Sequence, residues 1–302
     1  MSGFIVLNSG IFATIQDSGR YGYTDRGVCH SGALDMYAYL WSQMLLNNHN
    51  ANAIEFMTGL KLQATASLSI AITGANLTCK INGVTKAIWQ THSLAKGDII
   101  SFEKRVSGQR GYLAIKGGFV LEKVYGSYAT TLKEGIGMKL KRGDFLNSLP
   151  IDSFPLHRVH PSEIPEYQKP LLLRVLLSYQ EEYFSAKEKK KFFHSDYEIG
   201  LQSDRMGYRL QGEPINSSKK DIISEGIAYG SIQIPQDGQP ILLLKERQTL
   251  GGYPKIGTLL TIDCYKIAQA TIGSKVRFET IEIAEAQKKM QTFNRCFRTA
   301  FI

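Results

Sequence analysis

Two adjacent glycines and a group of polar side chains follow an apolar run near the end of the chain. Residues 241–244 are Ile-Leu-Leu-Leu, and residues 247–256 read Arg-Gln-Thr-Leu-Gly-Gly-Tyr-Pro-Lys-Ile. Gly251 and Gly252 allow positive φ and a close approach of the backbone to another group. A loop of this kind at a strand end is a candidate site for a small polar or anionic group. A tight turn that leaves a core strand fits the same residues.

A second glutamine precedes this run. Asp237-Gly238 is typical of a hairpin turn, and the returning strand would carry Gln248 and Thr249 back toward Gln233. Primary amides both donate and accept hydrogen bonds, which suits recognition of an amide-containing substrate. We therefore expect Gln233 and Gln248 to lie near each other.

Another polar phrase occurs near the start of the chain. Gln16, Asp17 and Arg20 belong to the phrase Gln-Asp-Ser-Gly-Arg, and Ser31 and Asp35 follow a little further on. An arginine fork beside exposed backbone donors can hold a carboxylate in bidentate fashion. A salt-bridged turn between Asp17 and Arg20 is the competing interpretation, and the residues fit both equally.

A related phrase occurs in the second half. Asp204, Arg205 and Arg209 lie within residues 203–209, where an acid beside two arginines suits anion recognition as well as ion pairing. Residues 20–23 are Arg-Tyr-Gly-Tyr and residues 205–208 are Arg-Met-Gly-Tyr, each with an aspartate just upstream. This similarity hints that the two halves are diverged copies that use the same turn.

The bulk composition is ordinary for a soluble globular protein. The chain has 302 residues, of which 43% are hydrophobic and 21% charged. Its length indicates two domains or one large β domain. No apolar run approaches the roughly 18 residues that a membrane span needs. The first residues lack a basic segment followed by a long apolar core, so we expect a cytoplasmic protein without a signal peptide.

The positive charge is unevenly distributed. The net charge is +9, with basic clusters at residues 187–191 and from residue 286 onward. A basic surface could attract nucleic acid, an acidic partner or an anionic substrate. No nucleic-acid-binding signature accompanies it. We expect solvated helix faces and a tail that docks on a partner protein, with neither nucleic acid nor membrane as a partner.

The cysteines form no metal-binding or disulfide pattern. Cys29, Cys79, Cys264 and Cys296 are scattered, without a CxxC pair or histidine at ligand spacing. Reduced thiols fit a cytosolic setting, and no metal is predicted. Cys29 stands beside His30, but a nucleophile pair is disfavoured because adjacent side chains rarely face each other.

Several catalytic signatures are absent from the sequence. The chain has no phosphate-binding loop of the Walker type, no dinucleotide fingerprint, no zinc-protease helix and no nucleophile elbow. An independent ATPase or serine hydrolase is therefore disfavoured. Met138-Lys139-Leu140 superficially resembles a biotin attachment sequence, but no compact carrier domain surrounds Lys139, so we expect no biotin on this chain.

Short apolar runs alternate with glycine-containing turns, which predicts a mainly β fold with a few helices. The expected strands are residues 67–72, 78–81, 99–103, 111–115, 171–177, 241–244, 258–262 and 276–280. A helix is expected at residues 33–47 from its apolar spacing, and two others at residues 181–193 and 282–297. Ser31 would lie near the N-cap of the first helix and Asp35 in its first turn. Asn82-Gly83 predicts a hairpin turn.

A proline-rich stretch divides the chain. Five of its nine prolines lie between residues 150 and 170. We expect an N-terminal β-rich domain at residues 1–150, a linker at 151–170, a C-terminal β-rich domain at 171–281 and a basic helical tail at 282–302.

Taken together, these phrases resemble one family closely. It is the KipA-type family, also called the allophanate hydrolase subunit 2 or biotin-dependent carboxyltransferase family. The matching phrases are residues 15–22, 31–35, 53–55, 108–114, 117–118, 126–127, 203–207, 224–226 and 248–254. They occur in the family's order from about residue 3 to residue 286.

The resemblance implies two cyclophilin-like β-barrel domains and a component of an ATP-dependent 5-oxoprolinase, a hydrolase acting on a cyclic amide C–N bond. It implies a hetero-oligomer of this C-type component with a KipI-type B component and a LamB/YcsF-type A component. The complex would use ATP and act on a small polar amide or carboxylate. The expected site residues are Gln16, Asp17, Arg20, Ser31, Asp35, Asp204, Arg205, Gln233, Gln248, Thr249, Gly251, Gly252 and Tyr253.

Three of these residues are assigned catalytic roles by hypothesis. Gln248, with the glycine backbone, would bind the substrate carbonyl, Tyr253 would donate a proton, and Arg205 would bind an anionic group together with Arg20. Two other roles fit the same family. The chain could be a regulatory binding partner that antagonises a KipI-type kinase inhibitor, or the carboxyltransferase component of a biotin-dependent urea or amide carboxylase.

Three positions depart from the family pattern. Tyr128 follows Gly126-Ser127 where an arginine is usual, and Met138 replaces an arginine. Glu246 stands where an aspartate is more usual. If a missing arginine binds substrate, the specificity of this chain differs from that of the common member.

Overall fold

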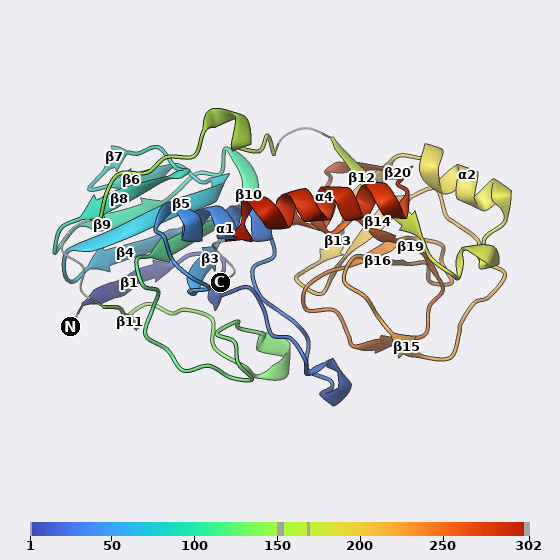
Figure 1. Cartoon of the computed structure of the whole chain (residues 1–302), viewed down its shortest axis with the longest axis horizontal. Coiled ribbons are helices and arrows are strands. Elements are labelled where there is room, and N and C mark those ends of the chain that lie inside the picture. Colours follow the sequence, from blue (N-terminus) through green and yellow to red (C-terminus); the bar gives the residue numbers. More distant parts are fainter. Residues whose placement is uncertain (1, 150–153, 168–169, 299–302) are drawn as a thin grey trace. The chain divides into compact units, whose positions relative to one another are not determined.

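The chain folds into two compact units that are mainly β. The computed structural model describes residues 2–149, 154–167 and 170–298. Unit 1 comprises residues 1–20, 31–168 and 296–302, and unit 2 comprises residues 21–30 and 169–295 (Figure 1). The described residues form twenty strands and four α-helices. The prediction of a mainly β chain with few helices is confirmed.

Unit 1 contains two sheets. The six-stranded sheet has the order β11 (Phe145–Asn147), β1 (Gly3–Ser9), β4 (Leu60–Ala64), β9 (Ile99–Phe102), β6 (Cys79–Ile81) and β7 (Val84–Thr85). The five-stranded sheet has the order β2 (Ala13–Gln16), β3 (Ala53–Phe56), β10 (Ser107–Ile115), β5 (Leu68–Asn76) and β8 (Gln90–Leu94). Helix α1 (Met36–Leu45) packs on β5 and β10. All strand pairs in these sheets are antiparallel.

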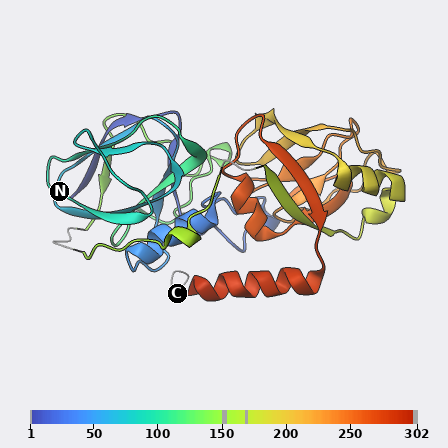
Figure 2. The same cartoon turned by 90° about the horizontal axis from the view of Figure 1, so that it is seen from above.

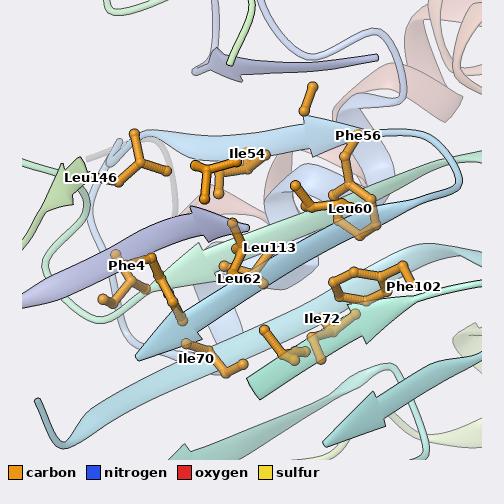
Figure 3. Packing of buried hydrophobic residues seen from close by; sticks show 14 of the residues in the cluster. Phe4, Ile54, Phe56, Leu60, Leu62, Ile70, Ile72, Phe102, Leu113 and Leu146 are labelled. Atoms are coloured by element: carbon orange, nitrogen blue, oxygen red, sulfur yellow. The ribbon is translucent and has the colours of Figure 1, made fainter. Parts of the chain in front are cut away.

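The core of unit 1 lies between these sheets, and the alternation of apolar and polar side chains in β4 shows how a strand contributes to it. In β4, Leu60 and Leu62 are fully buried whereas Lys61 is exposed, as the two-residue period of a strand requires. Figure 3 shows these leucines among side chains from the other sheet. The rings of Phe56 and Phe102 join the two sheets with centroids 4.2 Å apart.

Unit 2 is a closed seven-stranded barrel. Its order is β12 (Leu171–Leu177), β19 (Lys255–Leu259), β16 (Ser231–Gln233), β17 (Ile241–Leu243), β14 (Gly207–Gly212), β13 (Tyr197–Ser203) and β20 (Lys275–Thr280). The pair β12–β20 is parallel and the other pairs are antiparallel. Closure leaves no free sheet edge in the barrel. The predicted β-barrel is therefore present in this unit.

Helices and short strands complete unit 2. They are η1 (Thr24–Arg26), η4 (Glu181–Tyr183), α2 (Ala186–His194), β15 (Glu225–Gly226), β18 (Leu250–Gly251), α3 (Thr261–Ile267) and α4 (Ile283–Cys296). Among the described strands, β15 and β18 pair with each other and with no other strand. Figure 2 shows β20 leading into α4. Ala286 of α4 is buried, Met290 packs on the same apolar cluster, and the Phe293 ring lies 5.5 Å from that of Tyr265 on α3. One face of this helix therefore packs against its unit.

The sequence was misleading at residues 258–262. A strand was expected there, but β19 ends at Leu259 and α3 begins at Thr261. The apolar run continues across this boundary without a glycine or proline, so its pattern could not show where the strand stops. Asp263 stabilises the helix, since its buried carboxylate accepts from the side chain of Arg174 at 2.7 and 2.8 Å.

The predicted first helix is shorter than expected and capped by a different residue. Helix α1 begins at Met36, and the carboxylate of Asp35 caps it by accepting from the backbone N–H of Ala38 at 3.1 Å. Ser31 does not cap it, because its hydroxyl donates to the carbonyl of Thr130 at 2.7 Å.

The predicted hairpin at Asn82-Gly83 is confirmed. These residues join β6 to β7 with φ values of 50° and 80°, which are those of a type I′ turn. The expected linker and basic tail lie partly outside the described residues. Of the expected linker, residues 154–167 are described, and backbone bonds from Thr91 to His157 and from Val159 to Trp89 tie this segment to unit 1.

Candidate functional site

A cleft of about 450 Å³ lies in unit 2 beside barrel strands β13, β14, β16 and β17. We call it the barrel cleft. Its walls are Leu201, Gln202, Ser203, Asp204, Met206, Gly207, Arg209, Gln233, Ile241, Leu243, Gln248 and Tyr253. Four residues of the expected site therefore line this cleft: Asp204, Gln233, Gln248 and Tyr253. A fifth, Gly251, lies beside the two glutamines.

The two glutamines meet at Gly251. A Cβ atom built on Gly251 would lie 2.9 Å from Nε2 of Gln233, 3.2 Å from Nε2 of Gln248 and 2.5 Å from Cδ1 of Ile227. The hairpin prediction, which expected Gln233 and Gln248 to be near each other, thus agrees with the structure. Only a glycine leaves room for both amides at this point.

Gln233 carries an unsatisfied polar atom. Its side chain is 1% exposed, and no acceptor among the described residues takes a hydrogen bond from its Nε2. A buried amide donor without a partner costs about 1–3 kcal/mol. An oxygen of a bound molecule would remove this cost, so the unpaired amide marks the place in the barrel cleft where an acceptor fits.

Backbone hydrogen bonds and one ion pair hold the loop that carries Gln248 in place. Strands β15 and β18 pair Glu225 with Gly251, and the N–H of Ile222 donates to the carbonyl of Gly252 at 2.7 Å. Glu225 forms an ion pair with Lys255 just after the loop. These contacts hold the glycines in place without a tight turn.

The expectation of positive φ at the paired glycines is not met. Neither Gly251 nor Gly252 is among the residues with positive φ. They are required for close approach instead, because a Cβ atom on Gly252 would lie 2.9 Å from the carbonyl oxygen of Ile222. Both glycines therefore lie too close to neighbouring groups to carry a side chain.

The arginines of the second phrase form ion pairs. Arg205 is buried, and its Nε donates to the carboxylate of Glu246 at 2.5 Å. It does not line the barrel cleft, whereas its neighbour Asp204 does. Arg209 lines the cleft and pairs with Asp237. Arg209 belongs to the predicted phrase but was not among the expected site residues.

A smaller pocket of about 280 Å³ shares Gln248 with the barrel cleft. Its walls are Thr24, Cys29, His30, Gly226, Ile227, Ala228, Arg247, Gln248 and Thr249. We call it the Arg247 pocket. Thr249 therefore faces this pocket and not the barrel cleft. Arg247 and His30 were not expected here, because 217 positions separate them and no local pattern connects them.

In unit 1, four expected site residues converge on the segment 124–131. Gln16 and Ser31 both donate to the carbonyl of Thr130, at 3.1 and 2.7 Å. Arg20 is only 1% exposed, and its guanidinium donates to the carbonyl of Ala129 at 2.7 Å and to that of Val124 at 3.3 Å. These bonds to backbone carbonyls make Arg20 a residue that holds this segment in place.

Asp17 supports the same segment. Its carboxylate accepts from the hydroxyl of Ser127 at 2.8 Å and from the N–H of Tyr128 at 2.7 Å. It also accepts from the N–H of Gly19, two residues on, as Asp204 does from the N–H of Met206. Both related phrases thus begin with the same Asx turn.

Asp35 belongs to a buried polar network. Its carboxylate accepts from the hydroxyl of Tyr167 at 3.1 Å, and its N–H donates to the hydroxyl of Tyr112. The Tyr112 hydroxyl donates in turn to Glu55 at 2.8 Å. Burial raises the pKa of both tyrosines well above the usual value, so both remain protonated donors.

Two of the three departures from the family pattern line one cleft in unit 1. Tyr128 and Met138 are among the walls of a cavity of about 340 Å³, together with the apolar Leu121, Val124 and Phe145. The ammonium group of Lys123 lies 5.2 Å from the centre of the Tyr128 ring. This cleft is therefore more apolar than it would be with arginine at both positions.

Metal sites and membrane spans are not found in the described part of the chain. Among those residues, no three histidine, cysteine or acidic side chains are grouped so that they could hold a metal ion. Within the same ranges, no helix is long and apolar enough to cross a membrane.

Comparisons with known proteins agree with this architecture. The family model of the carboxyltransferase domain, subdomains A and B, matches residues 26–280. The chain is 33% identical to the 5-oxoprolinase C subunit of Escherichia coli over 301 residues, covering 97% of this chain and 96% of that protein. It is 27% identical to urea amidolyase of Lachancea kluyveri, covering 98% of this chain and 18% of that protein.

A solved structure shows the same fold. The urea carboxylase of Kluyveromyces lactis superposes with a TM-score of 0.91 at 24% identity, over 98% of this chain and 29% of that protein. The family match covers most of the chain, and the identity to the bacterial protein extends over nearly its full length. The chain therefore belongs to the family of the carboxyltransferase domain, subdomains A and B.

Proposed function

We propose that this chain is the C subunit of an ATP-dependent 5-oxoprolinase. In that reaction 5-oxoproline and ATP yield glutamate, ADP and phosphate, so a cyclic amide C–N bond is hydrolysed. The chain would act in the cytoplasm with a KipI-type B component and a LamB/YcsF-type A component. ATP would be used by the complex and bound outside the motifs of this chain. The identity to the Escherichia coli protein supports this proposal.

The observation that carries the proposal is the unpaired amide of Gln233 in the barrel cleft. Its Nε2 and that of Gln248 lie around Gly251. A lactam presents a carbonyl oxygen that accepts hydrogen bonds and an N–H that donates one. Two primary amides can satisfy both groups, and donors aimed at a carbonyl oxygen also stabilise the negative charge that develops there during hydrolysis.

The remaining roles follow from position. Tyr253 lines the barrel cleft and is 37% exposed, which suits a proton donor that meets bound substrate. Asp204 and Arg209 give the cleft one group of each charge. Anion binding by Arg205 stays a prediction. Its ion pair with Glu246 connects the turn between β13 and β14 to the residues that follow β17.

The test is formation of ADP and glutamate from 5-oxoproline by the reconstituted complex. We expect Gln248→Ala and Gln233→Met each to lower kcat by about 10²-fold, as loss of one donor to a developing oxyanion does. Gln233→Met removes an unpaired buried amide, so the free energy of unfolding should stay the same or rise by about 1 kcal/mol. Loss of activity without loss of stability separates substrate binding from a structural role.

Gln236→Met is the matched control. Gln236 is exposed on the same hairpin, bonds to Asp221 and does not line the barrel cleft. We expect full turnover from this variant. Wild-type turnover with both Gln248→Ala and Gln233→Met would reject the barrel cleft as the site.

A second candidate function is carboxyl transfer to a urea-like or amide substrate. The family model and the similarity to urea amidolyase support it. A urea carbonyl flanked by N–H groups would fit the same two glutamines. Transfer from carboxybiotin needs a separate carboxylase and carrier. Carboxylation of urea by the chain supplied with carboxybiotin, together with no glutamate from 5-oxoproline, would favour this function.

A further inference from the structure

Arg247 is a buried cation at the wall of a cavity. Its side chain lines the Arg247 pocket, and the residue is 6% exposed. Its Nε donates to the carbonyl of Ile227 at 2.9 Å, Nη1 to that of Leu244 at 3.3 Å, and Nη2 lies 3.3 Å from Nδ1 of His30. All three partners are neutral acceptors.

No carboxylate of a described residue compensates this charge. Within the described part of the chain, Arg247 has no ion pair, and its bonds use three of the five N–H groups of a guanidinium. Burial is the main cause of a lowered Arg247 pKa, and the groups that oppose this shift are tyrosines and cysteines. A buried charge without a counter-ion is costly, so an anion in the pocket would stabilise it.

The surroundings add positive potential. Lys245 is 4% exposed, and its ammonium group lies 5.2 Å from the centre of the Tyr229 ring, with the Arg247 guanidinium 5.8 Å from the same ring. His30 contributes no charge at neutral pH. Its pKa is lowered to about 4 by burial and by the nearby charges of Arg247 and Lys245.

The contact with Arg247 also fixes the tautomer of His30. Since a guanidinium only donates, Nδ1 of His30 must accept, and Nε2 then carries the proton. The imidazole is therefore a neutral donor at the wall of the pocket. Thr24 and Thr249 add hydroxyl groups to the same walls.

We propose that the Arg247 pocket is a binding site for a small carboxylate. Two N–H groups of Arg247 remain for a ligand, and a guanidinium can bind an oxyanion through two hydrogen bonds. Arg247 is the one charged residue among the walls given above, which suits the single charge of a carboxylate better than the higher charge of a phosphate. One water occupies about 30 Å³ of liquid, so the 280 Å³ pocket holds a ligand of several heavy atoms. This proposal goes beyond the proposed reaction and does not rest on it.

Saturation-transfer NMR with propionate tests the site on the isolated chain, at fixed ionic strength and without ATP or partner proteins. We expect saturable binding to the wild type that Arg247→Gln weakens at least tenfold. Because Arg247 also bonds to backbone carbonyls, its loss could impair folding. Ala228→Glu provides a second variant. Position 228 is exposed and lines the pocket, so the new carboxylate should replace propionate and reduce binding by a similar factor.

Two control variants accompany these substitutions. Ala228→Gln has nearly the same shape without the charge, and Lys219→Gln removes a positive charge from an exposed residue outside the pocket. Lys219→Gln should bind propionate as the wild type does, and Ala228→Gln should bind it at least tenfold more tightly than Ala228→Glu does. Equal binding by the wild type, Arg247→Gln and Ala228→Glu would overturn the proposal. Displacement of propionate by a tenfold lower concentration of phosphate would overturn the assignment to a carboxylate.

Discussion

Single residues in unit 2 combine steric and polar requirements at one point. Gly251 lies where the amides of Gln233 and Gln248 meet, and it leaves no space for a methyl group. The sequence showed the pair of glycines and both glutamines, and it indicated that the glutamines approach each other. It could not show that the glycine is needed for close contact, because that depends on the strand that lies opposite.

Gly251→Ala should therefore disable the site while leaving the unit folded. The new methyl group would lie 2.5 Å from Ile227 and 2.9 Å from the Gln233 amide, so these groups must move. We expect turnover of the reconstituted complex to fall at least tenfold, with a loss of about 1–3 kcal/mol in the free energy of unfolding. Steady-state kinetics and urea denaturation measure the two effects.

Gly226→Ala is the control for this substitution. Gly226 lies on β15, opposite β18, and a Cβ atom there would meet nothing within 4 Å. Its φ is not in the left-handed region. Equal losses of turnover in Gly226→Ala and Gly251→Ala would show that the short sheet, and not the contact with the glutamines, determines activity.

At the level of elements, regular patterns were predictable and short or adjoining elements were not. Strand β12 follows from its apolar run, β20 from the alternation of its side chains, and the Asn82-Gly83 hairpin from turn chemistry. Strands β15 and β18 have two residues each, too few for any period to appear. Helix α3 was missed because its apolar residues continue those of β19. Tertiary contacts, above all those of Asp263, decide that boundary.

Asp263→Asn tests how α3 is held. The carboxylate is fully buried, accepts from Arg174 at three atoms, and also pairs with Lys266 at 2.8 Å. Burial by itself opposes ionisation, but these bonds outweigh it and lower the Asp263 pKa. The asparagine would leave Arg174 without its counter-ion. We expect a loss of about 3–5 kcal/mol in the free energy of unfolding, measured by urea denaturation.

The exposed pair of Arg277 and Asp196 provides the comparison. Both side chains lie largely in solvent, and surface ion pairs of this kind contribute little. Asp196→Asn should leave the urea midpoint unchanged. If Asp263→Asn had as small an effect, the pair with Arg174 would not be what fixes α3 on β12.

At the level of the whole molecule, the chain does not divide at a single point. Residues 21–30 leave unit 1 and belong to unit 2, where Cys29 and His30 line the Arg247 pocket. The composition of the chain indicated a division near the prolines and gave no sign of this excursion. His30 and Arg247 are 217 positions apart in the sequence, so the Arg247 pocket forms only when the chain is folded. The pKa of a group in this pocket therefore differs between the folded and the unfolded chain.

The position of His30 in the Arg247 pocket predicts how the stability of the chain changes with pH. His30 has a pKa of about 4 in the folded chain and 6.5 as its ordinary value, because burial and the charges of Arg247 and Lys245 disfavour its protonation. Between these values the unfolded chain binds more protons than the folded chain. The contribution of neutral His30 to the free energy of unfolding is therefore full above pH 6.5 and is lost as the pH falls toward 4. The Tyr21 ring lies 5.0 Å from the His30 ring.

Urea denaturation followed by circular dichroism at about pH 7, 5.5 and 4.5 measures this effect. We expect the midpoint of the wild type to fall across this range and that of His30→Gln to fall less, since glutamine does not titrate. Trp41 and Trp89, the two tryptophans of the chain, both lie in unit 1, so tryptophan emission follows that unit separately. Parallel pH profiles for the two proteins would contradict the prediction, because His30 would then titrate alike in the folded and unfolded chains.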